Sequence, residues 1–424
     1  LLWALLPALI APPAGLRTIC ARVALLPREA LCRLRAFGHG KAARGTAVFS
    51  ALCGLSLLLL GAAGIRALFL ALPLGLSWLS VAPLRRWLEA PHRALIPLDP
   101  KERAQLADCA ARAFSILRRT DGSLPARPGD AGLYLLACAA ARPLGLLEPD
   151  EMAERMEKAL EQLERLPAWR GLPYAPDGLR IDSLDMGLLA ASLLCCAEAV
   201  ARDERLIDPG FRPLAGRMEA FVHGMDLAAL YDPSRDLFFA SVSPGVPARG
   251  AHIGLLLGQA RLLSFVAIAT GRVPPRHWLR LNRSIPSACS CALLPTLLLR
   301  MPPGTLLHEG CFQAVSKRIA DTGSVGVRLS TLALCVRPHA ATAELARLQA
   351  LGRLDTGPDA VGTATAACVL CAVCNALTGG ELIRLFHARP EIEGFSPLLE
   401  EPLRPDRTSA SPGNRRRAVP ASNR

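Results

Sequence analysis

The stretch Ala131-Gly-Leu-Tyr-Leu-Leu-Ala-Cys-Ala-Ala-Ala141 carries no charged residue and is apolar around its whole circumference when wound as a helix. Leu and Ala favour helix, and a helix that is apolar on every side must be buried on every side. Ser183 to Ala201 repeats this pattern, interrupted only by Asp185 and Glu198. The sequence therefore predicts two helices that other parts of the chain enclose.

Amphipathic segments alternate with these apolar ones. The segment that begins at Pro149 has a row of Met and Leu on one face and Glu–Arg or Glu–Lys pairs four residues apart on the other, as in a solvated outer helix. From Asp99 to Arg389, Pro and Gly signals separate about a dozen helical segments. An inner ring of helices wrapped by an outer ring explains the alternation, so the predicted fold class is all-α, a helical toroid.

The predicted toroid begins at Asp99-Pro100-Lys101-Glu102, where Asp caps a helix, Pro occupies the first turn and Glu follows three places after the cap. We assign residues 99–403 to this domain. Residues 404–424 are rich in Pro, Arg and Ser and are expected to form a disordered basic tail.

Residues 1–98 are expected to associate with a membrane. Hydrophobic residues make up 51% of the 424 and aromatics only 5%, and the mean hydropathy of +0.29 is too apolar for an ordinary soluble enzyme. After an apolar run over residues 1–16 and a basic loop, residues 47–82 are apolar apart from Arg66. Basic flanks favour a transmembrane hairpin in a bacterial inner membrane, with the following domain on the cytoplasmic side. One long tilted helix with an interfacial tail is the alternative.

The formal net charge of +13 is concentrated in the early loop and in the tail. Basic segments beside apolar spans are typical of contact with anionic lipid headgroups. Nucleic-acid binding is the competing interpretation, but no aromatic residues interleave with these charges and no known module is present. We therefore expect membrane lipid as a partner and no nucleic acid.

Most of the fourteen cysteines lie in apolar runs. Cys371-Ala-Val-Cys374 has the CxxC form, but no second pair and no histidine accompany it. We interpret these thiols as small core residues rather than zinc ligands, in a reducing compartment, and expect no metal and no cofactor.

Several motifs match one carbohydrate-active family, in order along the chain. They are Asp130-Ala-Gly-Leu-Tyr-Leu-Leu-Ala137, Asp182-Ser-Leu-Asp185-Met-Gly187-Leu-Leu-Ala190, Ala260-Arg-Leu-Leu-Ser-Phe-Val-Ala-Ile-Ala269 with His277-Trp278, and Gly379-Gly380 with Arg384-Leu-Phe-His387-Ala388. Over residues 75–403 the chain resembles the glycoamylase-like domain of bacterial cyclic β-1,2-glucan synthases, preceded by the tail of their membrane-embedded glycosyltransferase module. The resemblance implies an (α/α)6 barrel that closes a β-1,2-glucan into a ring by transglycosylation.

Cleaving and rejoining a glycosidic bond needs two carboxyl groups, one to protonate the leaving oxygen and one to act as nucleophile or base. The resemblance places two family glutamates at positions that read Cys291 and Leu329 here. We therefore assign no catalytic residue and expect a pseudoenzyme that has lost both catalytic carboxylates.

Four residues at matching positions are candidates for substrate binding, namely Asp182, Asp185, Tyr134 and Trp278. Asp185 lies in an otherwise apolar helix, where an unpaired carboxylate is unfavourable, so it either caps its helix or faces a central cleft. Tyr134 also fits a core tyrosine. Trp278 follows two prolines and also fits a loop anchor.

Three functions stay open. The first is a degenerate, membrane-anchored domain that binds β-glucan or associates with glucan-synthase components. The second is an active glycosyltransferase or glycoside hydrolase that uses other carboxylates, such as Asp185 with Glu309. The third is a non-catalytic membrane scaffold.

Overall fold

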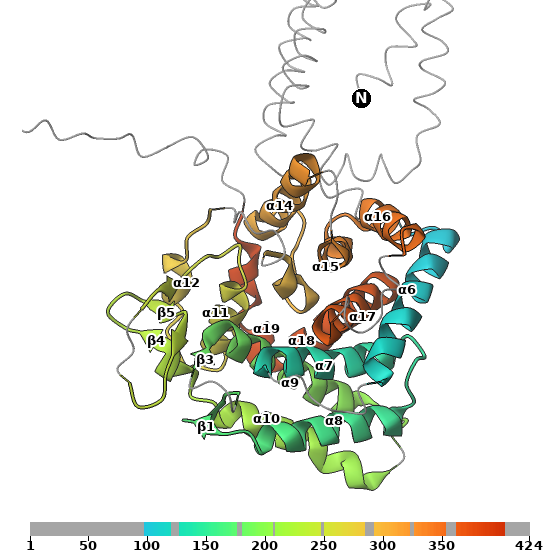
Figure 1. Ribbon diagram of the computed structural model, residues 1–424. Helices are drawn as coiled ribbons and strands as arrows, with labels where there is room; N and C mark the ends of the chain where they lie inside the picture. The colour runs from blue at the N-terminus through green and yellow to red at the C-terminus, as the bar shows by residue number, and fades with distance from the viewer. Residues whose placement is uncertain are drawn as a thin grey trace, which may run out of the picture. The chain divides into compact units, whose positions relative to one another are not determined.

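The computed structural model describes residues 97–119, 127–175, 180–206, 208–246, 250–284, 292–322, 326–352 and 362–402 (Figure 1). All of them belong to the second of two compact units, Trp87–Arg424. The predicted transmembrane hairpin at 47–82, the basic tail at 404–424 and Cys291 lie outside the described residues.

Helices make up most of the described chain. The α-helices are α6 (Pro100–Arg118), α7 (Pro128–Ala141), α8 (Pro149–Glu164), α9 (Ser183–Arg202), α10 (Arg212–Gly224), α11 (Ala260–Ala269), α12 (His277–Arg280), α14 (Leu306–Thr322), α15 (Val327–Leu332), α16 (Pro338–Ala350), α17 (Thr363–Thr378), α18 (Glu381–His387) and α19 (Pro390–Glu393). The 3-10 helices are η3 (Pro209–Phe211), η4 (Leu227–Leu230), η5 (Leu294–Leu297), η6 (Ala333–Cys335) and η7 (Ser396–Glu400).

The inner elements form a ring in chain order. Helix α7 packs against both α9 and α17, α11 packs against α9, and α15 packs against α17. The ring continues through η5, which contacts α15 and α17, and through a hydrogen bond of 2.8 Å from Arg261 of α11 to the carbonyl of Ala292. Helices α6, α8, α10 and α16 pack outside this ring, against α17, α7, α9 and α15 (Figure 1). The alternation of inner and outer elements is that of the predicted helical toroid.

Burial follows the sequence pattern. Every residue of α7 except Asp130 is buried, as predicted for a helix that is apolar all round. Outer helix α8 buries only one face and carries three ion pairs with i,i+4 spacing on the other. The predicted capping box at the start of α6 is also present, because Asp99 Oδ1 accepts from the Glu102 amide at 2.7 Å and Glu102 Oε2 accepts from the Asp99 amide at 3.0 Å.

Close approach of the inner helices depends on glycine. A Cβ atom at Gly187 of α9 would lie 2.6 Å from Leu263 Cα of α11, and one at Gly132 of α7 would lie 2.9 Å from Leu189 Cα of α9. Neither position can hold a larger residue unless the backbones move apart.

The structure adds short strands that the sequence did not predict. They are β1 (Ala168–Trp169) with β2 (Leu172–Pro173), β3 (Ile181–Asp182) with β6 (Ser241–Val242), and the sheet of β4 (Tyr231–Asp232), β5 (Leu237–Phe239) and β7 (His252–Ile253), all antiparallel. Each strand has two or three residues, too few for an alternating pattern to be visible. Strand β3 leads directly into α9, so the β3–β6 pair lies at the N-terminal end of that inner helix.

One described helix, α9, is long and apolar enough to cross a membrane, and the bent pair of α17 and α18 passes the same test if counted as one span. The apolar window of α9 is 72% buried within the fold. A buried core helix meets the same criteria of length and composition, so this observation is weak evidence for membrane association.

Candidate functional site

The N-terminal ends of α7 and α9 meet at one end of the ring and border a pocket of about 300 Å³. Asp182 caps α9 by accepting hydrogen bonds from the amides of Leu184 (2.9 Å) and Asp185 (3.3 Å). Two of the four predicted substrate-binding residues, Asp182 and Asp185, therefore line one pocket. Its full lining is Arg127, Pro128, Pro173, Tyr174, Ala175, Arg180, Ile181, Asp182, Asp185 and Met186.

Asp185 is held by Arg127, the residue that precedes α7. The guanidinium donates from Nε to Oδ2 and from Nη2 to Oδ1, both at 3.2 Å, in the bidentate geometry that suits a carboxylate. Gly129 makes room for this carboxylate, since a Cβ there would lie 2.5 Å from Asp185 Oδ1. The Asp185 side chain keeps 17% of its surface exposed, enough for contact with a ligand in the pocket.

The carboxyl group of Asp185 is less acidic than an ordinary aspartate. Burial is the main cause, and the negative charge of Asp182 adds to it, while Arg127 offsets part of the effect. Together they raise the pKa of Asp185 to about 6. A carboxyl group that lines a pocket and whose ionised form is destabilised by its surroundings is a candidate for a functional site.

Asp185→Asn is expected to stabilise the protein at neutral pH by roughly 1–3 kcal/mol. Because the folded-state pKa of about 6 lies above the ordinary 3.8, the ionised form opposes folding. This penalty is full above pH 6, shrinks as the pH falls, and is absent below pH 4. Unfolding measured at pH 7.5 and at pH 4 should therefore show a gain for Asp185→Asn only at the higher pH.

The matched control is Glu204→Gln, which removes an exposed carboxylate elsewhere. It should change stability little at either pH. A loss of stability in Asp185→Asn at pH 7.5 would show that the ion pair with Arg127 outweighs the cost of burial.

Two further pocket residues were not predicted from the sequence. Tyr174 is half-buried and presents an aromatic ring, and Arg180 is exposed and donates to Ser241 Oγ at 2.6 Å. An aromatic ring with polar donors and acceptors is the composition that carbohydrate binding uses. Only the fold brings these residues next to Asp185, because they precede α9 in irregular chain.

Tyr134 and Trp278 do not join this pocket. Their side chains are 1% and 2% exposed, and burial raises the pKa of Tyr134 to about 12. Trp278 packs edge-to-face against Phe265, with ring centroids 6.3 Å apart. Both residues are part of the core and present no ring face to a sugar, so their predicted binding role does not fit this structure.

The positions matched to family glutamates give no second carboxylate among the described residues. Leu329 lies in the first turn of α15 and packs partly buried against the core. Glu309 lies in α14 and accepts from Gln313 at 2.7 Å, and no described contact joins it to Asp185. The pairing of Asp185 with Glu309 therefore has no support in the described contacts.

Arg261 of α11 is fully buried without an acidic partner in the described chain. Its Nη2 donates to Ala292 O at 2.8 Å, and its two Nη atoms lie 3.6 and 3.7 Å from Cys311 Sγ, while Nε has no hydrogen-bond partner. A buried guanidinium normally pairs with a carboxylate, because an uncompensated charge in the interior is unfavourable. Nothing in the local sequence around Arg261 predicts this arrangement.

A serine–histidine pair also lies in the core. His277 Nε2 is 2.8 Å from Ser264 Oγ, and its Nδ1 donates to the Asp236 carbonyl at 2.6 Å. Both side chains are 0% exposed, so no substrate can reach them. The pair is a structural hydrogen-bond network.

The CxxC cysteines, Cys371 and Cys374, lie on α17 and are buried in the core of the domain. Burial raises the pKa of Cys371 well above its usual value and that of Cys374 to about 12, which keeps both thiols protonated. Within the described ranges no three His, Cys, Asp or Glu side chains gather as a metal site.

Solved structures of similar fold are carbohydrate-active proteins. An endo-β-1,2-glucanase from Chitinophaga pinensis superposes with a TM-score of 0.56 at 11% identity, covering 72% of this chain and 99% of the other. A candidate glucoamylase from Bacteroides caccae gives 0.56 at 12% identity, covering 70% and 99%. A β-1,2-glucanase from Parabacteroides distasonis gives 0.56 at 11% identity, covering 72% and 60%. At these identities the likeness shows a glycoamylase-like fold. No family model and no curated protein matches the chain.

Proposed function

We propose that this chain is a degenerate glycoamylase-like domain that lacks the two carboxylates needed for glycosyl transfer. It keeps a carbohydrate-binding pocket at one end of the helical ring, which we call the rim pocket. In this proposal it derives from a cyclic β-1,2-glucan synthase, and the rim pocket at Asp182 and Asp185 binds a β-glucan chain. The glycoamylase-like fold and the pocket's polar lining are consistent with this assignment.

The observation that carries the proposal is that the buried guanidinium of Arg261 has no acidic partner among the described residues. Its guanidinium donates to the carbonyl of Ala292, the residue bonded to Cys291. The resemblance expects a glutamate at position 291. A buried arginine without a carboxylate is the arrangement that loss of a neighbouring glutamate would leave behind. Leu329 at the second expected position removes the other carboxylate.

The absence of two carboxylates predicts the absence of turnover. The purified full chain, incubated with linear β-1,2-glucan, should release no reducing ends and no cyclic product above background, because neither acid nor nucleophile remains. Binding of the glucan, measured by calorimetry, should weaken in Asp182→Ala. Chain cleavage or ring closure that disappears in Asp185→Asn would overturn the proposal.

An active enzyme that uses Asp185 is the second candidate, and one observation favours it. A pKa of about 6 suits a group that must give up a proton near neutral pH. This candidate predicts turnover that falls as the pH rises through about 6, because Asp185 must carry its proton to act as the acid. It also needs a partner carboxylate, and among the described lining residues only Asp182, which caps α9, supplies one.

We also propose that the chain is anchored in a bacterial inner membrane, where glucan-synthase components are its partners. The apolar residues 47–82 and their basic flanks support this assignment. Carbonate extraction should leave the protein in the membrane pellet, and release into the supernatant would argue against any spanning segment.

A further inference from the structure

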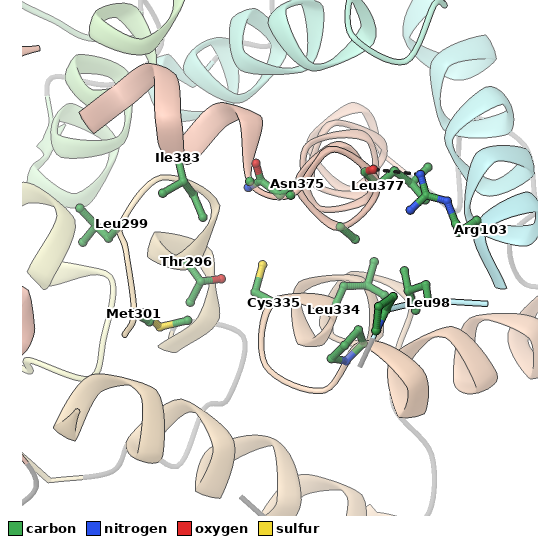
Figure 2. Close-up of a pocket in the computed structure, with 15 residues that line it drawn as sticks. Leu98, Arg103, Thr296, Leu299, Met301, Leu334, Cys335, Asn375, Leu377 and Ile383 are labelled. Carbon is green, nitrogen blue, oxygen red and sulfur yellow. Dashed lines mark hydrogen bonds between the residues drawn. The ribbon is translucent and has the colours of Figure 1, made fainter. Parts of the chain in front are cut away.

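A second pocket, of about 420 Å³, lies among the C-terminal end of α17, the start of α18, and the 3-10 helices η5 and η6. Figure 2 shows side chains from these elements around a common space, with Thr296, Cys335 and Ile383 on different sides of it. The volume falls within the range of about 300–1,000 Å³ that is typical of small-molecule sites.

The polar side chains of Asn375 and Thr296 already make hydrogen bonds within the fold. Asn375 donates to Leu297 O at 2.9 Å and accepts from the Leu382 amide at 3.0 Å, and Thr296 donates to Leu293 O at 2.6 Å. A sugar needs free donors and acceptors for its hydroxyl groups, and these side chains offer few. Apart from Arg103 and Cys335, the remaining lining residues are Leu, Ile, Met, Pro, Ala and Gly, whose side chains carry no polar group, and such a wall suits an alkyl chain.

One charge lines the pocket. Burial raises the pKa of Cys335 to about 11, which keeps its thiol neutral, so Arg103 of α6 is the single charged group among the lining residues. Its Nη2 caps α17 by donating to Leu377 O at 3.2 Å, and no described carboxylate forms an ion pair with it (Figure 2). Most of its five N–H donors are left for an anion.

We propose that this pocket binds a straight-chain fatty acid, with the alkyl chain inside and the carboxylate on Arg103. The apolar side chains of the wall select the alkyl chain of the ligand. The exposed guanidinium of Arg103, at the edge of the pocket, selects the carboxylate of the ligand. This site lies apart from the rim pocket at Asp185 and does not depend on the proposed glucan function.

Calorimetric titration of the full chain with octanoate, decanoate and decanol tests the site. Each added methylene group inside the pocket should strengthen binding about fourfold, so decanoate should bind at least tenfold more tightly than octanoate. Decanoate should also bind more tightly than decanol, because only the carboxylate pairs with Arg103. Equal affinity for decanoate and decanol would overturn the proposal.

Substitutions at the pocket test whether decanoate binds there. Ile383→Trp fills the pocket and should reduce decanoate affinity at least tenfold, while Arg103→Gln should remove the preference for decanoate over decanol. Arg112→Gln is the matched control, since Arg112 lies on the same helix and pairs with Asp108. If Ile383→Trp does not fold, Leu98→Asp places a repelling carboxylate at the pocket instead. Unchanged decanoate affinity in the folded pocket variant would refute the site, as would binding only to anionic phospholipid vesicles.

Discussion

Cys291→Glu is expected to raise the free energy of unfolding by about 3–5 kcal/mol, the amount that breaking a buried ion pair costs. Arg261 is 0% exposed and donates to the carbonyl of Ala292, which is bonded to residue 291. A glutamate at 291 would supply the carboxylate that the described surroundings of Arg261 lack. Urea unfolding of the purified protein measures the change.

Cys291→Gln is the control that separates charge from shape. Glutamine has nearly the size of glutamate and carries no charge, so it should give little of the gain. If glutamate is no better than glutamine, Arg261 is compensated by some other group and its charge is not a trace of a lost partner.

The same variant should not recover catalysis. Leu329 occupies the second expected glutamate position, so Cys291→Glu has one carboxylate where glycosyl transfer needs two. A gain in stability without turnover of β-1,2-glucan would separate a structural role of a glutamate at position 291 from a chemical one. Turnover in this variant would mean that Asp185 or another group serves as the partner acid.

The sequence predicts several helices well, inner and outer, because their signal is local. Residues 131–141 have no polar face, so their burial follows from composition alone, and the capping box at Asp99 depends only on neighbours three residues apart. The helical toroid follows from the alternation of such helices with amphipathic ones, whereas its glycoamylase-like character was implied by the family resemblance.

The candidate site depends on tertiary contacts that the sequence does not show. Trp278 follows two prolines, which suggested a loop, yet it packs on Phe265 in the core. Asp185 was predicted to cap its helix or face a cleft. The structure gives the cap to Asp182 and places Asp185 in the pocket, held by Arg127 from 58 residues away in the chain.

Arg261 was the least predictable residue of all. A single arginine in an apolar helix normally indicates an exposed position, because arginine is seldom fully buried without a partner. Only the packing of α11 against the segment at Ala292 and against α14 shows that it is enclosed. The unusual burial is informative because local sequence rules argue against it.

Arg261→Met is expected to stabilise the protein by about 1–3 kcal/mol, contrary to the usual effect of a core substitution. Methionine fills much of the same volume, makes apolar contacts with Cys311 and Met301, and removes a charge that no described carboxylate balances. The same substitution at Arg142 should have the opposite sign. Arg142 pairs with Asp203 at 2.8 Å, both partly buried, and its loss leaves that carboxylate unpaired.

Combining Arg261→Met with Cys291→Glu tests whether the two positions act on each other. In the methionine background the glutamate has no cation to meet, so it should destabilise the protein instead of stabilising it. This reversal of sign corresponds to a coupling energy of several kcal/mol in a double-mutant cycle. Additive effects would show that residue 291 does not face Arg261. Strong destabilisation by Arg261→Met alone would indicate that the hydrogen bonds of the guanidinium to the Ala292 carbonyl and to Cys311 Sγ outweigh the cost of burying its charge.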